Sequence, residues 1–397
     1  MFLKKIKLIL IFIILYQNPL YSKSTSFNDF NSRTLSNYFS GVIAFENKDN
    51  SKSLDFFNTS KVLLNNHKPY FKRYIYSLVL ENKINEAINI IKQKKNRNEP
   101  QFFESYLLLT IDSLKRNNFT KAFDYLTDIK KFTNQDRLNS AILDSLRNYV
   151  FVFKEKRLPN ETKDLGNLSL ISSTFQRCYL KDLNTESFFL NLINNNDSDF
   201  TRYIFFYLAY LIENNQIKDA KEITNDINFI NTSLLLSQGK SWIENDKEEK
   251  LNEVFSCQNH NDLVSEFLFL VSNLYSSQDD YIKSNFYLNL SFYLNPKFSF
   301  NLSLIAENQF SNREYNKVKK ILKEFKKQDS FYYWYRLKKE AQIISKEKNQ
   351  KESLNYIRTN FEKIKNPNEK FLFDLGNFYR NAKEYDQAIV YLSLIHI

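Results

Sequence analysis

The chain has 397 residues with 43% hydrophobic and 16% aromatic content, and 56 Lys and Arg against 45 Asp and Glu give a formal charge of +11. With only four glycines and six prolines, it lacks the tight turns of β-sandwiches, β-barrels and glycine-rich phosphate loops, and we expect turns with positive φ to be few. The aromatic content excludes a disordered chain and does not fit a coiled-coil seam. An all-α fold with short polar turns is therefore predicted.

The first 22 residues have the three-part form of a secretory signal peptide. A basic start precedes an apolar run, Leu8–Tyr16, which is too short to span a bilayer, and Ser22 stands before Lys23. We expect cleavage after Ser22 and a bacterial periplasmic location, with an uncleaved N-terminal anchor as the alternative. No later segment is apolar enough for a transmembrane helix, and residues 23–34 are predicted to be a linker.

The last part of the chain carries a spaced pattern of bulky and small residues. Leu375 and Gly376 form a pair, Tyr379 follows three residues after the glycine, and Ala388 follows twelve after it. This pattern resembles the tetratricopeptide repeat (TPR), a pair of antiparallel helices with a small residue where they cross. The resemblance implies a right-handed superhelical solenoid of helix hairpins, with a concave groove lined mainly by the first helix of each hairpin.

A small marker residue in the second helix recurs backwards along the chain in steps of 31 to 35 residues, which gives about eleven repeats. The markers before Ala388 are Ser353, Val318, Ser284, Leu251, Ala220, Ser187, Lys154, Ala122, Ala87 and Ser53. Pro296 falls on the terminal proline position of the repeat around Ser284. The pattern predicts TPR-like repeats over 35–134 and 201–391, the last one incomplete, and degenerate helical repeats over 135–200.

The final six residues, 392–397, do not continue the pattern, because Ile395 stands where a small residue is required. The segment "LSLIHI" matches the translation of a sequencing-library transposon end. We expect these residues to be a non-native tail on a C-terminally truncated fragment.

No catalytic or cofactor-binding motif is present, so we expect the residues present to be non-enzymatic, with no cofactor and no metal. His67 is expected in a solvated turn, and His260 forms only a C-x2-H half-site with Cys257. An oxidising compartment permits Cys178 and Cys257 to pair, but we expect two separate thiols.

In repeats of the resembling family, the second, fifth, ninth and twelfth positions of each first helix face a bound peptide. In the last two repeats these positions are Tyr335, Lys338, Gln342 and Ser345, then Lys370, Phe373, Asn377 and Arg380. Basic and amide groups on one face would suit a peptide carboxylate or an acidic segment. An ordinary solvated face is the alternative.

The leading hypothesis is an exported, non-enzymatic repeat scaffold that binds extended peptide or helical segments of envelope proteins. A second hypothesis makes the repeats the N-terminal arm of a larger envelope protein, such as a cell-wall hydrolase or an outer-membrane export barrel. A third is an RNA-binding helical-repeat array, but the signal peptide argues against a nucleic-acid partner. The basic excess is spread along the chain and fits the composition of an AT-rich genome.

Overall fold

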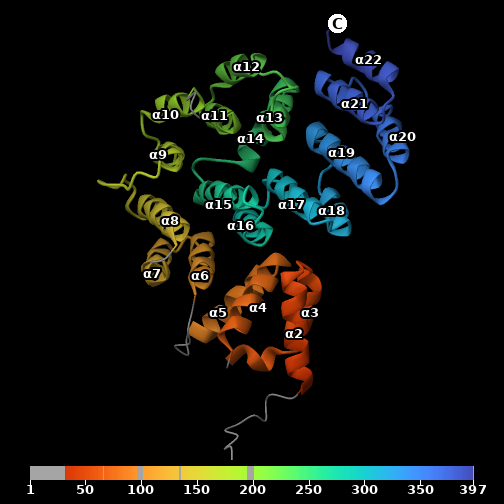
Figure 1. The fold of residues 1–397 in the computed structure, drawn as a ribbon. Helices are drawn as coiled ribbons and strands as arrows, with labels where there is room; N and C mark the ends of the chain where they lie inside the picture. The colour runs from red at the N-terminus through yellow and green to blue at the C-terminus, as the bar shows by residue number, and fades with distance from the viewer. Residues whose placement is uncertain (1–31, 66, 96–101, 134–135, 195–200, 397) are drawn as a thin grey trace, which may run out of the picture. The chain divides into compact units, whose positions relative to one another are not determined.

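The structure is a computed structural model that describes residues 32–65, 67–95, 102–133, 136–194 and 201–396 (Figure 1). Within these ranges every regular element is a helix, and consecutive helices pack as antiparallel hairpins. The predicted all-α, TPR-like arrangement of helix hairpins is therefore confirmed. The predicted signal peptide, its cleavage point after Ser22 and most of the predicted linker lie outside the described residues.

The chain divides into two compact units, with the boundary between Ser77 and Leu78. In the first unit, α2 (Ser32–Glu46) packs on α3 (Asn50–Asn58), so helix begins inside the predicted linker. A 3-10 helix (Lys61–Asn65) leads to α4 (Lys68–Leu80), which carries the boundary.

The second unit contains the remaining helices, most of which pair in sequence order (Figure 1). They are α5 (Ile84–Lys95), α6 (Phe103–Lys115), α7 (Phe119–Ile129), α8 (Arg137–Glu155), α9 (Asn167–Leu180), α10 (Thr185–Ile193), α11 (Arg202–Glu213), α12 (Ile217–Asn225), α13 (Leu234–Glu244), α14 (Glu249–Val254), α15 (His260–Ser276), α16 (Tyr281–Leu294), α17 (Phe300–Ser311), α18 (Tyr315–Leu322), α19 (Ser330–Glu347), α20 (Gln350–Phe361), α21 (Glu369–Asn381) and α22 (Tyr385–Ser393), with short 3-10 helices at Lys130–Phe132 and Leu394–His396.

The turns inside the hairpins correct one expectation, because backbone with positive φ is common despite the scarcity of glycine. Asn82, Asn117, Asn215 and Asp279 all have φ between 58° and 60°. Asn and Asp tolerate this region because their short side chains hydrogen-bond locally. The prediction of few such turns was wrong, since it counted glycine alone.

In several hairpins a residue of the first helix faces the marker residue twelve positions later. Ser53 Oγ donates to the carbonyl oxygen of Gly41 at 3.1 Å, and Ser353 Oγ donates to that of Ala341 at 2.7 Å. Small side chains at these positions let the two backbones come within hydrogen-bond reach. The buried repeat-packing residues are Ser53, Ala87, Ala122, Ala220, Ser284, Leu375, Gly376, Tyr379 and Ala388.

The pattern does not hold throughout the middle of the chain. Markers Lys154 and Ser187 are exposed, and Lys154 lies in the last turn of the long helix α8. Pro296 is also exposed, and it follows Asn295, the C-cap residue of α16. Residues 156–166 form an irregular connection to α9.

Helices that are distant in sequence also pack against each other in the second unit. α15 contacts α6, α8 and α9, and α13 contacts α19. A disulfide between Cys178 of α9 and Cys257, just before α15, joins two of these regions with a Cα–Cα distance of 5.5 Å. The expectation of separate thiols was wrong, because the two cysteines are 79 positions apart and the sequence between them carries no signal of this approach.

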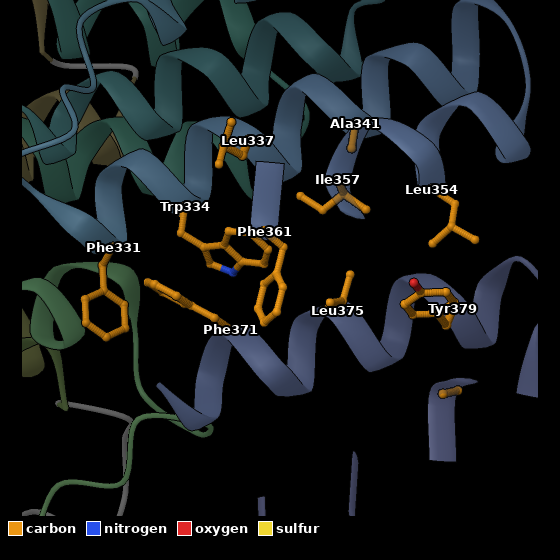
Figure 2. Packing of buried hydrophobic residues seen from close by; sticks show 11 residues of the cluster. Phe331, Trp334, Leu337, Ala341, Leu354, Ile357, Phe361, Phe371, Leu375 and Tyr379 are labelled. Carbon is orange, nitrogen blue, oxygen red and sulfur yellow. The ribbon is translucent and has the colours of Figure 1, made fainter. Parts of the chain in front are cut away.

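The last hairpins share an aromatic core that holds α19, α20 and α21 together (Figure 2). Trp334 of α19 is 1% exposed, and its ring centroid lies 5.0 Å from Phe371 and 5.9 Å from Phe361. Burial of such rings supplies most of the packing free energy between neighbouring hairpins. This core fixes the spacing of α19 and α21, which line the pocket described next.

Candidate functional site: a pocket between α19 and α21

A pocket of about 440 Å³ lies between α19 and α21, the first helices of the last two hairpins. α19 contributes Lys338, Gln342, Ser345 and Lys346, and α21 contributes Asp374, Asn377, Phe378 and Asn381. Phe310 of α17 and Gln350 and Ser353 of α20 complete the lining.

The helical repeat explains why these side chains share a wall. Lys338, Gln342 and Ser345 are four and three residues apart, and residues with these spacings lie on one face of an α-helix. Asn377 and Asn381 are likewise four apart on α21. The buried Ser353, bonded to the Ala341 carbonyl, holds α20 close behind α19.

An ion pair joins the two helices at one side of the pocket. Lys338 Nζ lies 2.7 Å from Asp374 Oδ2, and Trp334 Nε1 donates to the same oxygen at 2.8 Å. The two partners are 25% and 18% exposed. Asp374 therefore neutralises Lys338 and positions it, so this lysine is not a free cation for a ligand.

Side-chain amides make up much of the remaining polar wall. Gln342, Asn377 and Asn381 line the pocket without a side-chain hydrogen bond to any other residue that the structure describes. Each amide offers both a donor and an acceptor, which is what the backbone of an extended peptide requires. Lys346 adds a cation at the pocket, and Phe310 and Phe378 add apolar surface.

Four of the eight predicted groove residues come together here, namely Lys338, Gln342, Ser345 and Asn377. Their role in binding stays a prediction. Phe373 is half-buried and Arg380 is exposed, and neither lines the pocket.

Tyr335 has a different position from the one predicted. Its hydroxyl donates to Glu307 Oε1 at 2.8 Å and contacts the Ser303 carbonyl at 3.1 Å. Burial, together with Glu307, raises the pKa of Tyr335 well above its usual value. This tyrosine joins α19 to α17 and does not present its hydroxyl to a ligand.

Lys370 is also engaged elsewhere. Its ammonium donates to the carbonyl oxygens of Phe229, Ile230 and Thr232 at 2.9, 3.2 and 2.9 Å. Burial lowers the pKa of Lys370 despite the neighbouring Asp374. The lysine ties α21 to the connection between α12 and α13, a contact across about 140 residues of sequence that no local pattern indicates.

Asp374 and Asn381 are pocket residues that the sequence analysis did not select. They lie three residues before and four after Asn377, so the helical period alone could have found them. The four positions of α21 that the resemblance implies do not include either residue.

The two histidines considered as ligands both have structural contacts. The Nε2 of His67 is 2.9 Å from the Tyr38 hydroxyl, so this half-buried ring is not simply solvated as expected. The Nε2 of His260 lies 2.9 Å from the Leu114 carbonyl, and burial lowers the pKa of His260. Among the described residues, no group of three or more His, Cys, Asp or Glu side chains is arranged to hold a metal ion.

None of the described helices combines the length and apolar character needed to cross a bilayer.

No protein-family model matches the chain, and no curated protein sequence matches it. Among solved structures, it resembles the crystal structure of yeast Tom70, with 11% identity over 91% of each chain and a TM-score of 0.24. It also resembles a structure of Naa15/Naa10 bound to HypK-THB, with 13% identity over 92% of this chain and 63% of that one, again at 0.24. These TM-scores are too low for any property of the chain to be based on them.

Proposed function

We propose that the chain is an exported, non-enzymatic helical-repeat scaffold that binds an extended segment of an envelope protein in the pocket between α19 and α21. The observation that carries this proposal is the set of amides, Gln342, Asn377 and Asn381, on facing first helices. An extended peptide has one unpaired N–H and one C=O on each residue along its edge, and these amides can pair with both.

Export is supported by the disulfide between Cys178 and Cys257, because buried disulfides persist in oxidising compartments and are rare in the cytosol. The apolar run Leu8–Tyr16, which follows a basic start, also supports export.

The proposal is tested by photo-crosslinking in the envelope of the cell that makes the protein. A photoreactive residue placed at Gln342 should capture one recurrent polypeptide segment, mapped by mass spectrometry. The double variant Asn377→Ala, Asn381→Ala should abolish the product, while a photoreactive residue at exposed Lys218 on α12 serves as the matched control. If residue 342 captures nothing that residue 218 does not also capture, the proposed peptide site is wrong.

A further inference from the structure

A second pocket, of about 290 Å³, lies where α5, α6 and α7 meet. Its charged lining residues are Lys92 of α5, Asp112 and Arg116 at the end of α6, and Lys121 of α7. Ser113, Asn118 and Tyr125 complete the lining. The proposed peptide site uses none of these residues.

Asp112 holds two of the cations in place. It is 3% exposed, and its carboxylate accepts from Lys92 Nζ at 2.6 Å and from Arg116 Nε at 2.9 Å. Burial alone would raise the pKa of Asp112, but the hydrogen bonds from Lys92 and Arg116 lower it overall. The carboxylate therefore stays ionised and fixes both cations at the pocket.

The pocket has more positive than negative charge. Three cations against one carboxylate leave a surplus of two positive charges (3 − 1 = 2). Among the described residues, Lys121 has no acidic partner, and its ammonium lies 5.9 Å from the centroid of the Tyr125 ring. A surplus of this size in a concave site attracts anions more strongly than the same charges spread over a convex surface.

Several hydrogen-bond donors remain available around this surplus. Arg116 uses Nε for Asp112, which leaves the Nη donors of its planar guanidinium. The N-cap residue of α7, Asn118, accepts from the Lys121 N–H through Oδ1, so its Nδ2 group can still donate. Ser113 adds a hydroxyl to the lining. Arginine forks and lysine ammoniums are the groups that proteins use to bind phosphate.

We propose that this pocket binds a phosphate group, supplied either by free phosphate or by the headgroup of an anionic phospholipid. The dianionic form of free phosphate matches the surplus of two. A phosphodiester headgroup carries one negative charge, as a carboxylate does, but its two non-bridging oxygens suit the Arg116 fork and the lysine ammoniums. Asp112 repels any anion. Its hydrogen bonds to Lys92 and Arg116 also hold these two side chains at the pocket. A bound phosphate therefore meets cations that are already positioned.

The test uses the full chain at low ionic strength, in two arms. In the first, inorganic phosphate is titrated by calorimetry, with acetate at equal ionic strength as the competing monoanion. In the second, the protein is sedimented with phosphatidylglycerol vesicles and with phosphatidylcholine vesicles. We expect saturable binding in at least one arm, and binding at least about tenfold weaker in Lys121→Gln, because the variant loses a charged hydrogen-bond donor to the anion.

The control is Lys218→Gln, which removes an exposed lysine of α12 and should leave binding unchanged. Arg116→Gln should weaken binding like Lys121→Gln, and circular dichroism melts of both variants establish that they fold. Binding dependent on Lys121 to phosphatidylglycerol vesicles alone identifies the headgroup as the source. Binding dependent on Lys121 to inorganic phosphate identifies a soluble ligand. Failure to bind in both arms, equal competition by acetate, or insensitivity to Lys121→Gln would overturn the proposal.

Discussion

The Cδ2 atom of Leu251 lies 3.5 Å from the point where a Cβ atom on Gly239 would stand, twelve residues earlier in the chain. This hairpin reverses the usual order, because its small residue is in the first helix and its bulky residue is at the marker position. Val318 at the marker position similarly lies twelve residues after buried Ala306. Where the two helices of a hairpin cross, one of the two facing residues must therefore be small. The small residue can be in either helix and need not be at the marker position.

Substitution of Gly239 by alanine tests this packing rule. The added Cβ would lie 2.8 Å from Cδ2 of Phe205, whose fully buried ring stacks at 5.9 Å on Phe298 and has little room to move. Overpacking of a core costs about 1–3 kcal/mol, whereas Gly→Ala inside an unobstructed helix gains about 1 kcal/mol. We expect a lower urea midpoint with an unchanged slope. A higher midpoint would show that the crossing has room, and Lys218→Ala provides the baseline for an exposed helical site.

The parts of the fold that could be predicted from sequence are those determined by local patterns. Gly376 and Ala388 lie on facing helices of one hairpin, and their spacing of twelve is visible in the sequence because short polar turns fix it. The marker Lys154 failed because α8 continues past the expected turn to Glu155. The apolar period of a helix continues unchanged through such a longer helix. Counting back from marker to marker at the repeat length therefore predicts a turn where the helix in fact continues.

Among the predicted groove residues, too, residues whose position is set within their own helix line the pocket, and one that is held by a contact distant in sequence does not. Lys338, Gln342 and Asn377 were selected from the positions that the resemblance to TPRs implies, and the structure places them in the lining of one pocket. Lys370 has an equivalent position in the pattern, but the Phe229 carbonyl, from a segment 141 residues away, accepts a hydrogen bond from it. A single sequence has no signal for contacts of that range, and the same limit explains why the pairing of the two cysteines was missed.

Loss of the disulfide should destabilise the second unit. Cys178 and Cys257 are 2% and 1% exposed, and the Gln258 side chain donates to the Cys178 carbonyl beside them. A crosslink closing a long loop contributes about 2–4 kcal/mol by restricting the unfolded chain. We expect Cys178→Ser, Cys257→Ser to lower the denaturant midpoint, and reduced wild type to match the variant. Mass spectrometry after alkylation of the unreduced, unfolded chain should find no free thiol; two alkylated cysteines would contradict the pairing.

Stability should fall as the pH rises from about 4 to about 7 because of Asp262. Burial raises the pKa of this carboxyl to about 7, although Ser256 N–H and Asn259 Nδ2 donate to it at 3.0 and 2.9 Å. In this window the folded chain holds a proton that the unfolded chain releases. Raising the pH therefore favours unfolding.

Asp262→Asn should remove this contribution, since asparagine carries no titrating proton and keeps an acceptor for Ser256. The free energy of unfolding is measured by urea titration between pH 4 and pH 8 in the wild type and the variant. Equal slopes against pH in both proteins would rule out Asp262 as the source. Lys297 and Glu213 also face the group, and their opposing effects are common to both proteins.

The buried ion pair between Arg202 and Glu266 should be costly to break and nearly neutral to replace. Arg202 donates to both carboxylate oxygens, at 2.9 and 2.7 Å, and the Glu266 side chain is 0% exposed. The guanidinium also lies 4.0 Å from the ring centroid of Phe269 and 4.7 Å from that of Phe300. The pair thus joins α11 to α15 inside an aromatic environment, where an unpaired charge has no water to solvate it.

Arg202→Met leaves the carboxylate unpaired, and removal of one partner of a buried pair costs about 3–5 kcal/mol. The double variant Arg202→Met, Glu266→Met replaces both charges by side chains of similar volume that pack against the same rings, so it should recover most of that loss. Burial already raises the pKa of Glu266 in the presence of Arg202. Without the guanidinium the pKa must rise further, so the single variant should lose stability as the pH increases while the double variant should not. Urea titrations at pH 5 and pH 8 separate the two effects. If the double variant were no more stable than Arg202→Met at either pH, the lost stability would come from the aliphatic and aromatic packing of Arg202 and not from its charge.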